Sequence, residues 1–172
     1  LTVADDPAVY HNYDRLTCLD RYTGERQWAA KTALRDGTGN RMVPWTSRNT
    51  VAMQDDTVLV FGPPQLEAFD ADSGKKLWSA EGPGGAGTTP DLFVIDDLVW
   101  FGGPKRNWNM RNPRNALKGG LRETVITKRG RNLRTGEVER TVEVENLVDF
   151  GHHFRCYRSK ATERYLLLPK RG

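Results

Sequence analysis

The sequence predicts an all-β protein made of repeated units. A thirteen-residue pattern occurs at 16–28 and again fifty positions later at 66–78, and a degenerate copy occurs at 128–140. Short alternating or apolar runs flank each copy, and stretches rich in Gly, Pro, Asn and Asp separate these runs, as between strands. A repeat of this period indicates a solenoid, a propeller or an array, so it sets the fold class before any local reading.

Each copy of the pattern predicts a hairpin turn followed by a buried tryptophan. The conserved spacing is an Asp, a Gly four residues later and a Trp four residues after that: Asp20, Gly24 and Trp28; Asp70, Gly74 and Trp78; and, in the degenerate copy, Asn132, Gly136 and Arg140. The Asp side chain accepts backbone N–H groups ahead of it, a Thr or Ser assists, and the Gly supplies a positive φ. A buried indole needs a partner for its N–H, so we expect each Trp to pack between adjacent sheets.

The remaining runs read as strands in chain order. Strands are expected at 8–13, 16–19, 25–30, 50–53, 58–61, 65–69, 75–80, 92–95, 98–101, 121–127, 138–144 and 165–168. Two pairs of acids, Asp55-Asp56 and Asp96-Asp97, occupy the same place in successive units and favour hairpin turns. The wholly apolar run 58–61 is typical of a strand covered on both faces.

The two complete copies resemble the repeat of the pyrroloquinoline-quinone-type (PQQ-like) β-propellers, a bacterial group. The resemblance implies four-stranded antiparallel blades, about three to four of them here, as part of a larger ring from a longer chain. It places blade pieces at about 1–47, 48–88, 89–147 and 148–172. The copy at 128–140 departs from the family pattern at the Asp and Trp slots.

An insertion at 102–120 interrupts the third repeat and is a candidate binding loop. Its basic and aromatic residues are Lys105, Arg106, Trp108, Arg111 and Arg114. Long loops on a rigid scaffold often carry function, and Trp108 is either an exposed recognition residue or a plug packed on the blade. Residues 1–102 carry 9 Lys/Arg and 15 Asp/Glu (net −6) and residues 103–172 carry 17 and 7 (net +10), which sum to the +4 of the chain. The excess of basic residues is either solvated charge on loops or a sign that the protein binds an anionic polymer. No sequence motif indicates that it binds a nucleic acid.

The densest group of reactive side chains follows at 149–165. His152, His153 and Cys156 are the candidates for a metal site, although adjacent histidines on a strand face opposite sides. A segment packed between blades explains them as well, so we expect neither a metal nor a catalytic set. Cys18 and Cys156 either pair or remain free thiols.

The favoured function is a non-catalytic scaffold or binding domain in a periplasmic, envelope or secreted bacterial protein. Its partners would be another protein, the remaining blades of the propeller or an anionic polymer. The resemblance leaves two alternatives: a fragment of a quinone-dependent alcohol or sugar dehydrogenase, which would bind PQQ and calcium, and a propeller subunit of a larger enzyme complex. No calcium ligand set or catalytic Asp maps onto this sequence. No signal peptide is visible in the segment, and no apolar stretch approaches the roughly 20 residues of a membrane span.

Overall fold

Three four-stranded antiparallel sheets make up most of the computed structural model. The model describes residues 2–3, 7–12, 14–34, 50–62, 65–81, 91–101, 126–144 and 160–167. Sheet 1 comprises β1 (Thr2–Val3), β2 (Pro7–Asn12), β3 (Arg15–Asp20) and β4 (Arg26–Lys31). Sheet 2 comprises β5 (Thr50–Gln54), β6 (Thr57–Gly62), β7 (Gln65–Asp70) and β8 (Lys76–Glu81). Sheet 3 comprises β9 (Leu92–Ile95), β10 (Leu98–Phe101), β11 (Ile126–Asn132) and β12 (Val138–Val144), and β13 (Lys160–Ala161) pairs with β14 (Leu166–Leu167).

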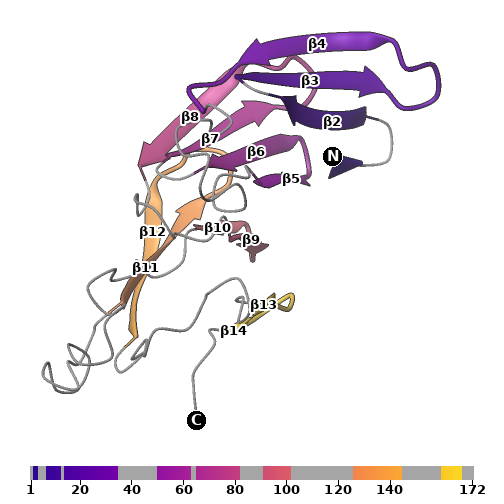
Figure 1. Cartoon of the computed structure of the whole chain (residues 1–172). Coiled ribbons are helices and arrows are strands. Elements are labelled where there is room, and N and C mark those ends of the chain that lie inside the picture. The colour runs from indigo at the N-terminus through magenta and orange to yellow at the C-terminus, as the bar shows by residue number, and fades with distance from the viewer. Residues whose placement is uncertain are drawn as a thin grey trace, which may run out of the picture.

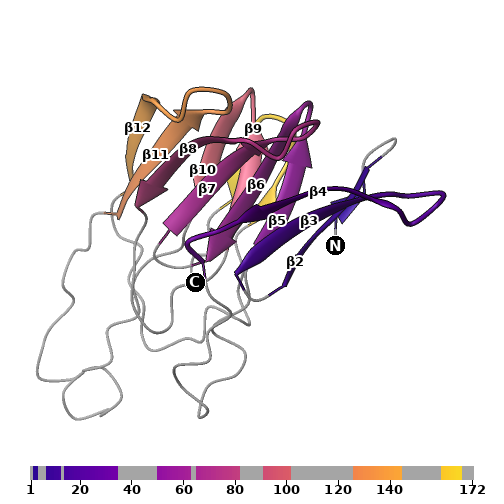
Figure 2. The ribbon, with the colours of Figure 1, turned by 90° about the horizontal axis from the view of Figure 1, so that it is seen from above.

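The three sheets follow one another in chain order as blades of a propeller. Within each sheet, strands that are consecutive in the chain are neighbours, so each sheet is a simple meander (Figure 1). The main strand contacts between sheets join β5 to β1 and β2, and β5 to β9. The first strands of the sheets therefore lie closest together, and Figure 2 shows the sheets side by side from above. The all-β, four-stranded fold class expected from the sequence is confirmed.

Strand β11 extends beyond its sequence-based expectation. Of the strand expected at 121–127, residues 126 and 127 begin β11, which continues to Asn132, and residues 121–125 fall outside the described part of the chain. Basic residues and Gly130 interrupt the apolar alternation of β11, so its periodicity is weak. It is pairing with β10 and β12 that makes this segment a strand.

The Asp-to-Gly segment forms the same turn in all three sheets. The first-position side chain accepts backbone N–H groups: Asp20 Oδ1 from Tyr22 at 2.9 Å and Thr23 at 2.7 Å, Asp70 Oδ1 from Ser73 at 2.8 Å, and Asn132 Oδ1 from Arg134 at 2.8 Å and Thr135 at 2.9 Å. The Thr and Ser hydroxyls of the two complete copies also donate to the Asp, at 3.0 Å and 2.6 Å. The glycines have φ of 73°, 67° and 75°, which only glycine adopts without strain. The turn chemistry expected from the sequence is present.

A register shift precedes each of these turns at the same place. It falls between Cys18 and Leu19 in sheet 1, between Ala68 and Phe69 in sheet 2, and between Gly130 and Arg131 in sheet 3. A bulge increases local twist and redirects the side chains around it. The repeat therefore conserves the direction of the strand that carries the Trp slot as well as the turn.

The paired acids form the hairpin turns expected between the first and second strands of sheets 2 and 3. Asp55 has φ of 49°, and Asp96 and Asp97 have φ of 50° and 59°, a region that Asp tolerates better than most residues. The carbonyls of Asp56 and Asp97 accept the N–H groups of Ala71 and Leu133, each at 2.9 Å. Each acid pair is thus tied to the Asp-to-Gly turn of its own sheet.

The hydrophobic core lies between the sheets rather than within any one of them. All of β6 is buried, because its alternate side chains face opposite neighbours. Val58 and Val60 join a cluster with sheet 1, whereas Leu59 and Phe61 join a cluster with sheet 3. Phe61 meets Phe101 of sheet 3 edge-to-face, with ring centroids 5.2 Å apart. This explains the continuous apolar run that the sequence shows there.

Because of the turn aspartates, we expect the protein to lose stability in acid. The Thr23 N–H holds the pKa of Asp20 below its ordinary value, and the Ser73 hydroxyl does so for Asp70. A pKa lowered by folding contributes stability above the unfolded-state pKa, about 3.9 for Asp, and this stability is lost as the pH falls through the lowered folded-state value. Urea unfolding at pH 7 and pH 3 should show this loss.

The matched variant replaces both aspartates with asparagine, because asparagine (Asn132) occupies the same position of the turn in sheet 3. Asp20→Asn with Asp70→Asn keeps an oxygen acceptor but removes the titration. The double variant should therefore lose less stability between pH 7 and pH 3 than the parent. Equal losses would show that these two carboxylates do not contribute to the acid sensitivity.

Candidate functional site: the interfaces between sheets

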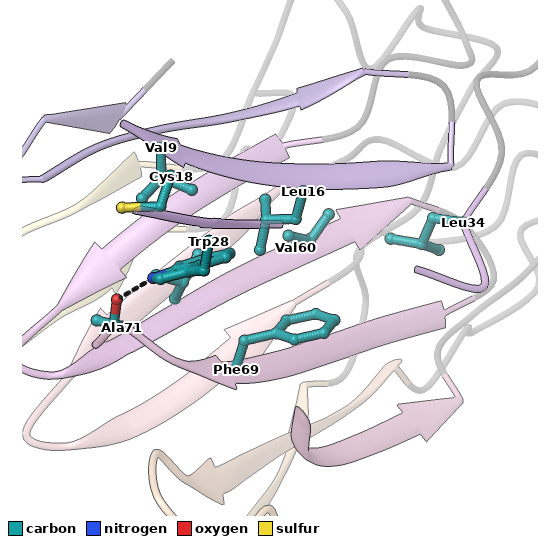
Figure 3. Close-up of a cluster of buried hydrophobic side chains, with 9 residues drawn as sticks. Val9, Leu16, Cys18, Trp28, Leu34, Val60, Phe69 and Ala71 are labelled. Atoms are coloured by element: carbon teal, nitrogen blue, oxygen red, sulfur yellow. Dashed lines mark hydrogen bonds between the residues drawn. The ribbon is translucent and has the colours of Figure 1, made fainter. Parts of the chain in front are cut away.

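Each Trp of the two complete copies binds the turn of the following sheet. Trp28 Nε1 donates to the carbonyl of Ala71 at 2.7 Å, and its side chain is buried among residues of sheets 1 and 2 (Figure 3). Trp78 Nε1 donates to the carbonyl of Leu133 at 3.0 Å. Ala71 and Leu133 both directly follow the first residue of the turn. The two indoles thus make the same bond across successive interfaces.

The turn glycine of the following sheet lies against the indole. A Cβ on Gly74 would lie 2.5 Å from Cε3 of Trp28, and a Cβ on Gly136 would lie 2.6 Å from Cδ2 of Trp78. Real Cβ atoms essentially never approach heavy atoms this closely. Glycine is required there for close approach as well as for its positive φ, and the local sequence pattern indicated only the second reason.

Sheet 3 carries a different arrangement in place of the missing tryptophan. Arg140 occupies the Trp slot and is exposed. Gly130, which pairs with Arg140, lies against Trp100 of β10, where an added Cβ would be 2.6 Å from Cζ2. The indole in sheet 3 therefore comes from a neighbouring strand and covers a glycine of its own sheet.

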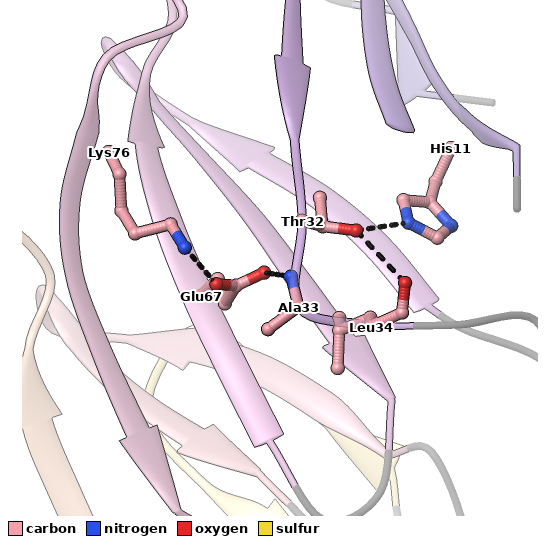
Figure 4. A network of polar contacts seen from close by, with 6 residues as sticks. All are labelled: His11, Thr32, Ala33, Leu34, Glu67 and Lys76. Atoms are coloured by element: carbon pink, nitrogen blue, oxygen red, sulfur yellow. Dashed lines mark hydrogen bonds and ion pairs between the residues drawn. The ribbon is translucent and has the colours of Figure 1, made fainter. Parts of the chain in front are cut away.

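A buried carboxylate makes a second link between sheets 1 and 2. Glu67 on β7 is fully buried, accepts the N–H of Ala33 at 2.9 Å and forms an ion pair with Lys76 of β8 (Figure 4). Ala33 belongs to the segment that leaves β4 of sheet 1. Sequence reasoning missed Glu67, and the available signal was a charged residue inside an otherwise buried strand.

Hydrogen bonds also fix the segment that leaves sheet 1. The Thr32 N–H donates to the carbonyl of Asp14 at 2.8 Å, and its hydroxyl donates to the carbonyl of Leu34 at 3.1 Å. His11 Nε2 lies 2.9 Å from the same hydroxyl (Figure 4). Ala33 is therefore presented to Glu67 from a segment that is already held in place.

Two further buried groups occupy positions of the repeat. Lys128 takes the place of Leu16 and Leu66; burial lowers the pKa of its amine, and nearby Asp91, also buried, opposes this effect. Cys18 is a free, fully buried thiol whose Sγ lies 3.3 Å from Gln27 Oε1. Burial, and then the charge of Asp72, raises the pKa of this thiol. A low-pKa reactive cysteine needs the opposite environment.

The structure brings only part of the sequence-based candidate set together. The turn and Trp residues meet at the sheet interfaces, as set out above. The candidate binding loop, with Lys105, Arg106, Trp108, Arg111 and Arg114, lies outside the described residues, as do His152, His153 and Cys156. Within the described ranges, no group of three His, Cys, Asp or Glu side chains could hold a metal ion, and no helix is long and apolar enough to span a membrane.

The strands that flank the insertion fix its point of attachment. Residues 13–14 and 63–64 join the second and third strands of sheets 1 and 2, whereas residues 102–125 join the same strands of sheet 3. The third strand of each sheet ends at the Asp-to-Gly turn. The insertion therefore leaves from the opposite end of sheet 3.

Solved structures with a similar fold include the following three. BamB from Moraxella catarrhalis matches with a TM-score of 0.56 at 18% identity, covering 94% of this chain and 39% of that chain. A europium-containing methanol dehydrogenase matches at 0.54 and 14% identity, covering 82% and 23%. The quinohemoprotein alcohol dehydrogenase from Comamonas testosteroni matches at 0.53 and 19% identity, covering 82% and 20%. The chain thus spans less than half of each of these proteins.

Sequence comparison adds no closer relative. No protein-family model matches the chain, and no curated protein matches it. The likeness to the solved structures, all under 25% identical, therefore concerns the fold alone.

Strands β5 and β9 carry no charged side chain of the kind that would hold PQQ with a calcium ion. Strands β5 and β9 lie where the sheets come closest together, and their side chains are Thr, Val, Ala, Met, Gln, Leu, Phe and Ile. A calcium ion takes oxygen ligands, chiefly carboxylates, and the carboxylates of the quinone need cationic or N–H donors. These two strands supply neither acids nor bases, so a quinone site would have to come from other residues.

Substitutions of Trp28 should show how much its contacts between sheets 1 and 2 contribute to the free energy of unfolding. Trp28→Ala should lower the free energy of unfolding by about 3–5 kcal/mol, the range for deleting a buried large aromatic. Trp28→Phe keeps a ring but leaves the buried carbonyl of Ala71 without its donor, which should cost about 1–3 kcal/mol. Denaturant unfolding measures both, with exposed Tyr165→Ala as the control. If Trp28→Phe lowered the free energy of unfolding no more than Tyr165→Ala does, the indole N–H would contribute nothing to stability.

The ion pair between Lys76 and Glu67 leads to a prediction about stability when the lysine is removed. Lys76→Met removes its counter-ion and should cost about 1–3 kcal/mol, because the carboxylate stays buried. Adding Glu67→Leu should recover much of this loss, since replacing both members of a buried pair with apolar residues is often near neutral. The neighbouring exposed Lys75→Met is the control. A double variant less stable than Lys76→Met alone would contradict this account.

Proposed function

We propose that this chain, which has the fold of part of a PQQ-like β-propeller, acts as a non-catalytic scaffold that binds a protein or an anionic polymer through its 102–120 insertion. The proposal places the protein in the periplasm, in the envelope or outside the cell. Because a likeness of fold does not give a function, the proposal rests on features of this chain itself.

One observation carries the proposal: the connection between β10 and β11. The equivalent connections of sheets 1 and 2 are residues 13–14 and 63–64, so the insertion belongs to sheet 3 alone. Residues 102–120 hold Lys105, Arg106, Arg111, Arg114 and Lys118 and no acid. A long loop of one charge sign, attached to a rigid sheet, is suited to an anionic partner, and Trp108 adds an aromatic of the kind enriched at binding hot spots.

The roles of the other polar groups support a scaffold. Asp20 and Asp70 are engaged by the turns, and Glu67 is engaged by Ala33 and Lys76. Asp20 and Asp70 therefore shape the turns, and Glu67 joins sheets 1 and 2. Such carboxylates are poor candidates for proton transfer, because protonating them would weaken the hydrogen bonds that they accept.

Binding to heparin, used as a sulfated polymer, tests the proposal, with neutral dextran as the blank. Replacing Lys105, Arg106, Arg111 and Arg114 with Ser should weaken heparin binding at least tenfold and reduce its salt dependence. The charge-matched control replaces Arg15, Arg26, Lys31 and Lys75, all exposed in sheets 1 and 2. Equal affinity for both variants would place binding outside the insertion. Loss of affinity only in Trp108→Ala would indicate stacking rather than charge.

A quinone-dependent dehydrogenase is the second candidate, because two of the similar solved structures are dehydrogenases. It predicts stoichiometric PQQ binding in the presence of calcium, measured by absorbance titration, together with dye-linked oxidation of alcohols or sugars. Saturable binding with activity would replace the scaffold proposal. Copurification of a stable catalytic partner would instead favour a propeller subunit of a larger enzyme.

A further inference from the structure

Two buried polar atoms of sheets 2 and 3 have no hydrogen-bond partner within the described part of the chain. They are Oγ1 of Thr57 on β6 and Nε of Arg131 on β11. The Thr57 side chain is fully buried. An unpaired buried polar group is destabilising, so buried polar groups in native proteins are nearly always paired, with protein, ordered water or an ion. The two atoms therefore call for a ligand that the protein chain itself does not supply.

Both side chains are directed into the interface between sheets 2 and 3. Side chains alternate along a strand, so Thr57 shares the face of β6 that carries Leu59 and Phe61, and these two pack against sheet 3. Arg131 is the cross-strand partner of Val99, which belongs to the same hydrophobic cluster. Cross-strand partners share a face of their sheet, so Arg131 is directed from sheet 3 toward sheet 2.

Contacts with the Asp-to-Gly turn of sheet 3 place the two residues at the same end of this interface. Nη1 of Arg131 donates to the carbonyl of Gly136 in that turn at 2.7 Å. Asp56, which precedes Thr57 in the chain, forms a 2.7 Å ion pair with Arg134 of the same turn. Thr57 and Arg131 are thus both tied, directly or through a neighbour, to one turn.

The charges around Arg131 favour an anion over a water molecule. Among the described residues, no carboxylate forms an ion pair with Arg131. Burial, and then the positive charge of Arg129, lowers the pKa of the Arg131 guanidinium. Arginine nevertheless stays protonated in proteins. A water molecule would accept the hydrogen bonds but leave this charge uncompensated, whereas an anion would do both.

We propose that one small inorganic anion, of the size of chloride, binds between sheets 2 and 3 and is held by the Nε–H of Arg131 and the hydroxyl of Thr57. The Nε–H group can only donate, and the hydroxyl hydrogen can rotate toward the same ligand, so both groups suit a negatively charged acceptor. The inference does not depend on the scaffold function proposed above.

The corresponding positions between sheets 1 and 2 hold no such donors. Pro7 pairs with Asp20 as Thr57 pairs with Asp70, so Pro7 takes the place of Thr57. Phe69 takes the place of Arg131, and its ring joins the apolar cluster between sheets 1 and 2. Of these two interfaces, only the one between sheets 2 and 3 combines a buried hydroxyl with a guanidinium at these positions.

Thermal denaturation tests the proposal in the protein as its own cells make it, in sodium gluconate to which chloride is added at constant sodium concentration. Tm should rise with chloride and then level off, as for a ligand that binds the folded state at one site. Thr57→Val and Arg131→Met should each raise the chloride concentration needed by about tenfold or more, the loss expected for one hydrogen bond to a charged group. Arg140→Met, which removes an exposed guanidinium from the other face of sheet 3, is the control and should respond as the parent does.

Two results of this titration would overturn the proposal. A parent Tm that does not respond to chloride would leave water as the ligand of Thr57 and Arg131. A chloride response that Arg131→Met retains in full would show that the anion binds elsewhere on the protein.

Crystals of the parent protein grown in sodium bromide provide a readout that needs no variant. The anomalous signal of bromide should place one ion within hydrogen-bond distance of both Oγ1 of Thr57 and Nε of Arg131. Bromide found only at other positions, or at none, would contradict the proposal.

Discussion

An indole seated on the turn glycine of the next sheet is the contact on which the arrangement of sheets depends. In both complete copies the Trp lies four residues beyond its own Gly, and a bulge precedes the turn at the same place. The Gly of the next sheet must lack a side chain to admit the ring. The same short pattern therefore serves as donor on one side of a sheet and receptor on the other.

Local chemistry explains what could be predicted from the sequence. The roles of Asp20 and Gly24 follow from neighbours three and four residues away, so a single copy of the pattern suffices. The need for space at Gly74 depends on Trp28, 46 positions earlier, and only the folded arrangement brings the two together. Repetition predicted that Trp packs between sheets, but it could not say which atoms the indole meets.

Burial accounts for the other differences. Glu67 sits in the second copy where the first has Thr17, and its place inside the otherwise apolar run 66–69 was the one local signal of a buried carboxylate. Gly130 breaks the pattern of β11, yet Trp100 of the neighbouring strand fills the space. Both features come from contacts between strands that sequence periodicity does not encode.

Departures from the repeat gather in its third copy. Sheet 3 combines Arg140 in the Trp slot, Lys128 in a Leu position and the insertion between its middle strands. The first two sheets hold the regular interfaces, so the third tolerates specialised features while remaining tied to them through Trp78. The insertion proposed to bind a partner thus belongs to the sheet that departs most from the repeat.

The forward reach of each tryptophan also orders events during synthesis. Trp28 finds its acceptor 43 residues later and Trp78 finds its acceptor 55 residues later. At about 5–20 residues per second on the ribosome, a nascent sheet waits roughly 2–11 s for the turn that covers its indole. Sheets 1 and 2 are thus each completed by the sheet made after them, and a chain that has just formed either sheet carries one uncovered indole at its newest edge.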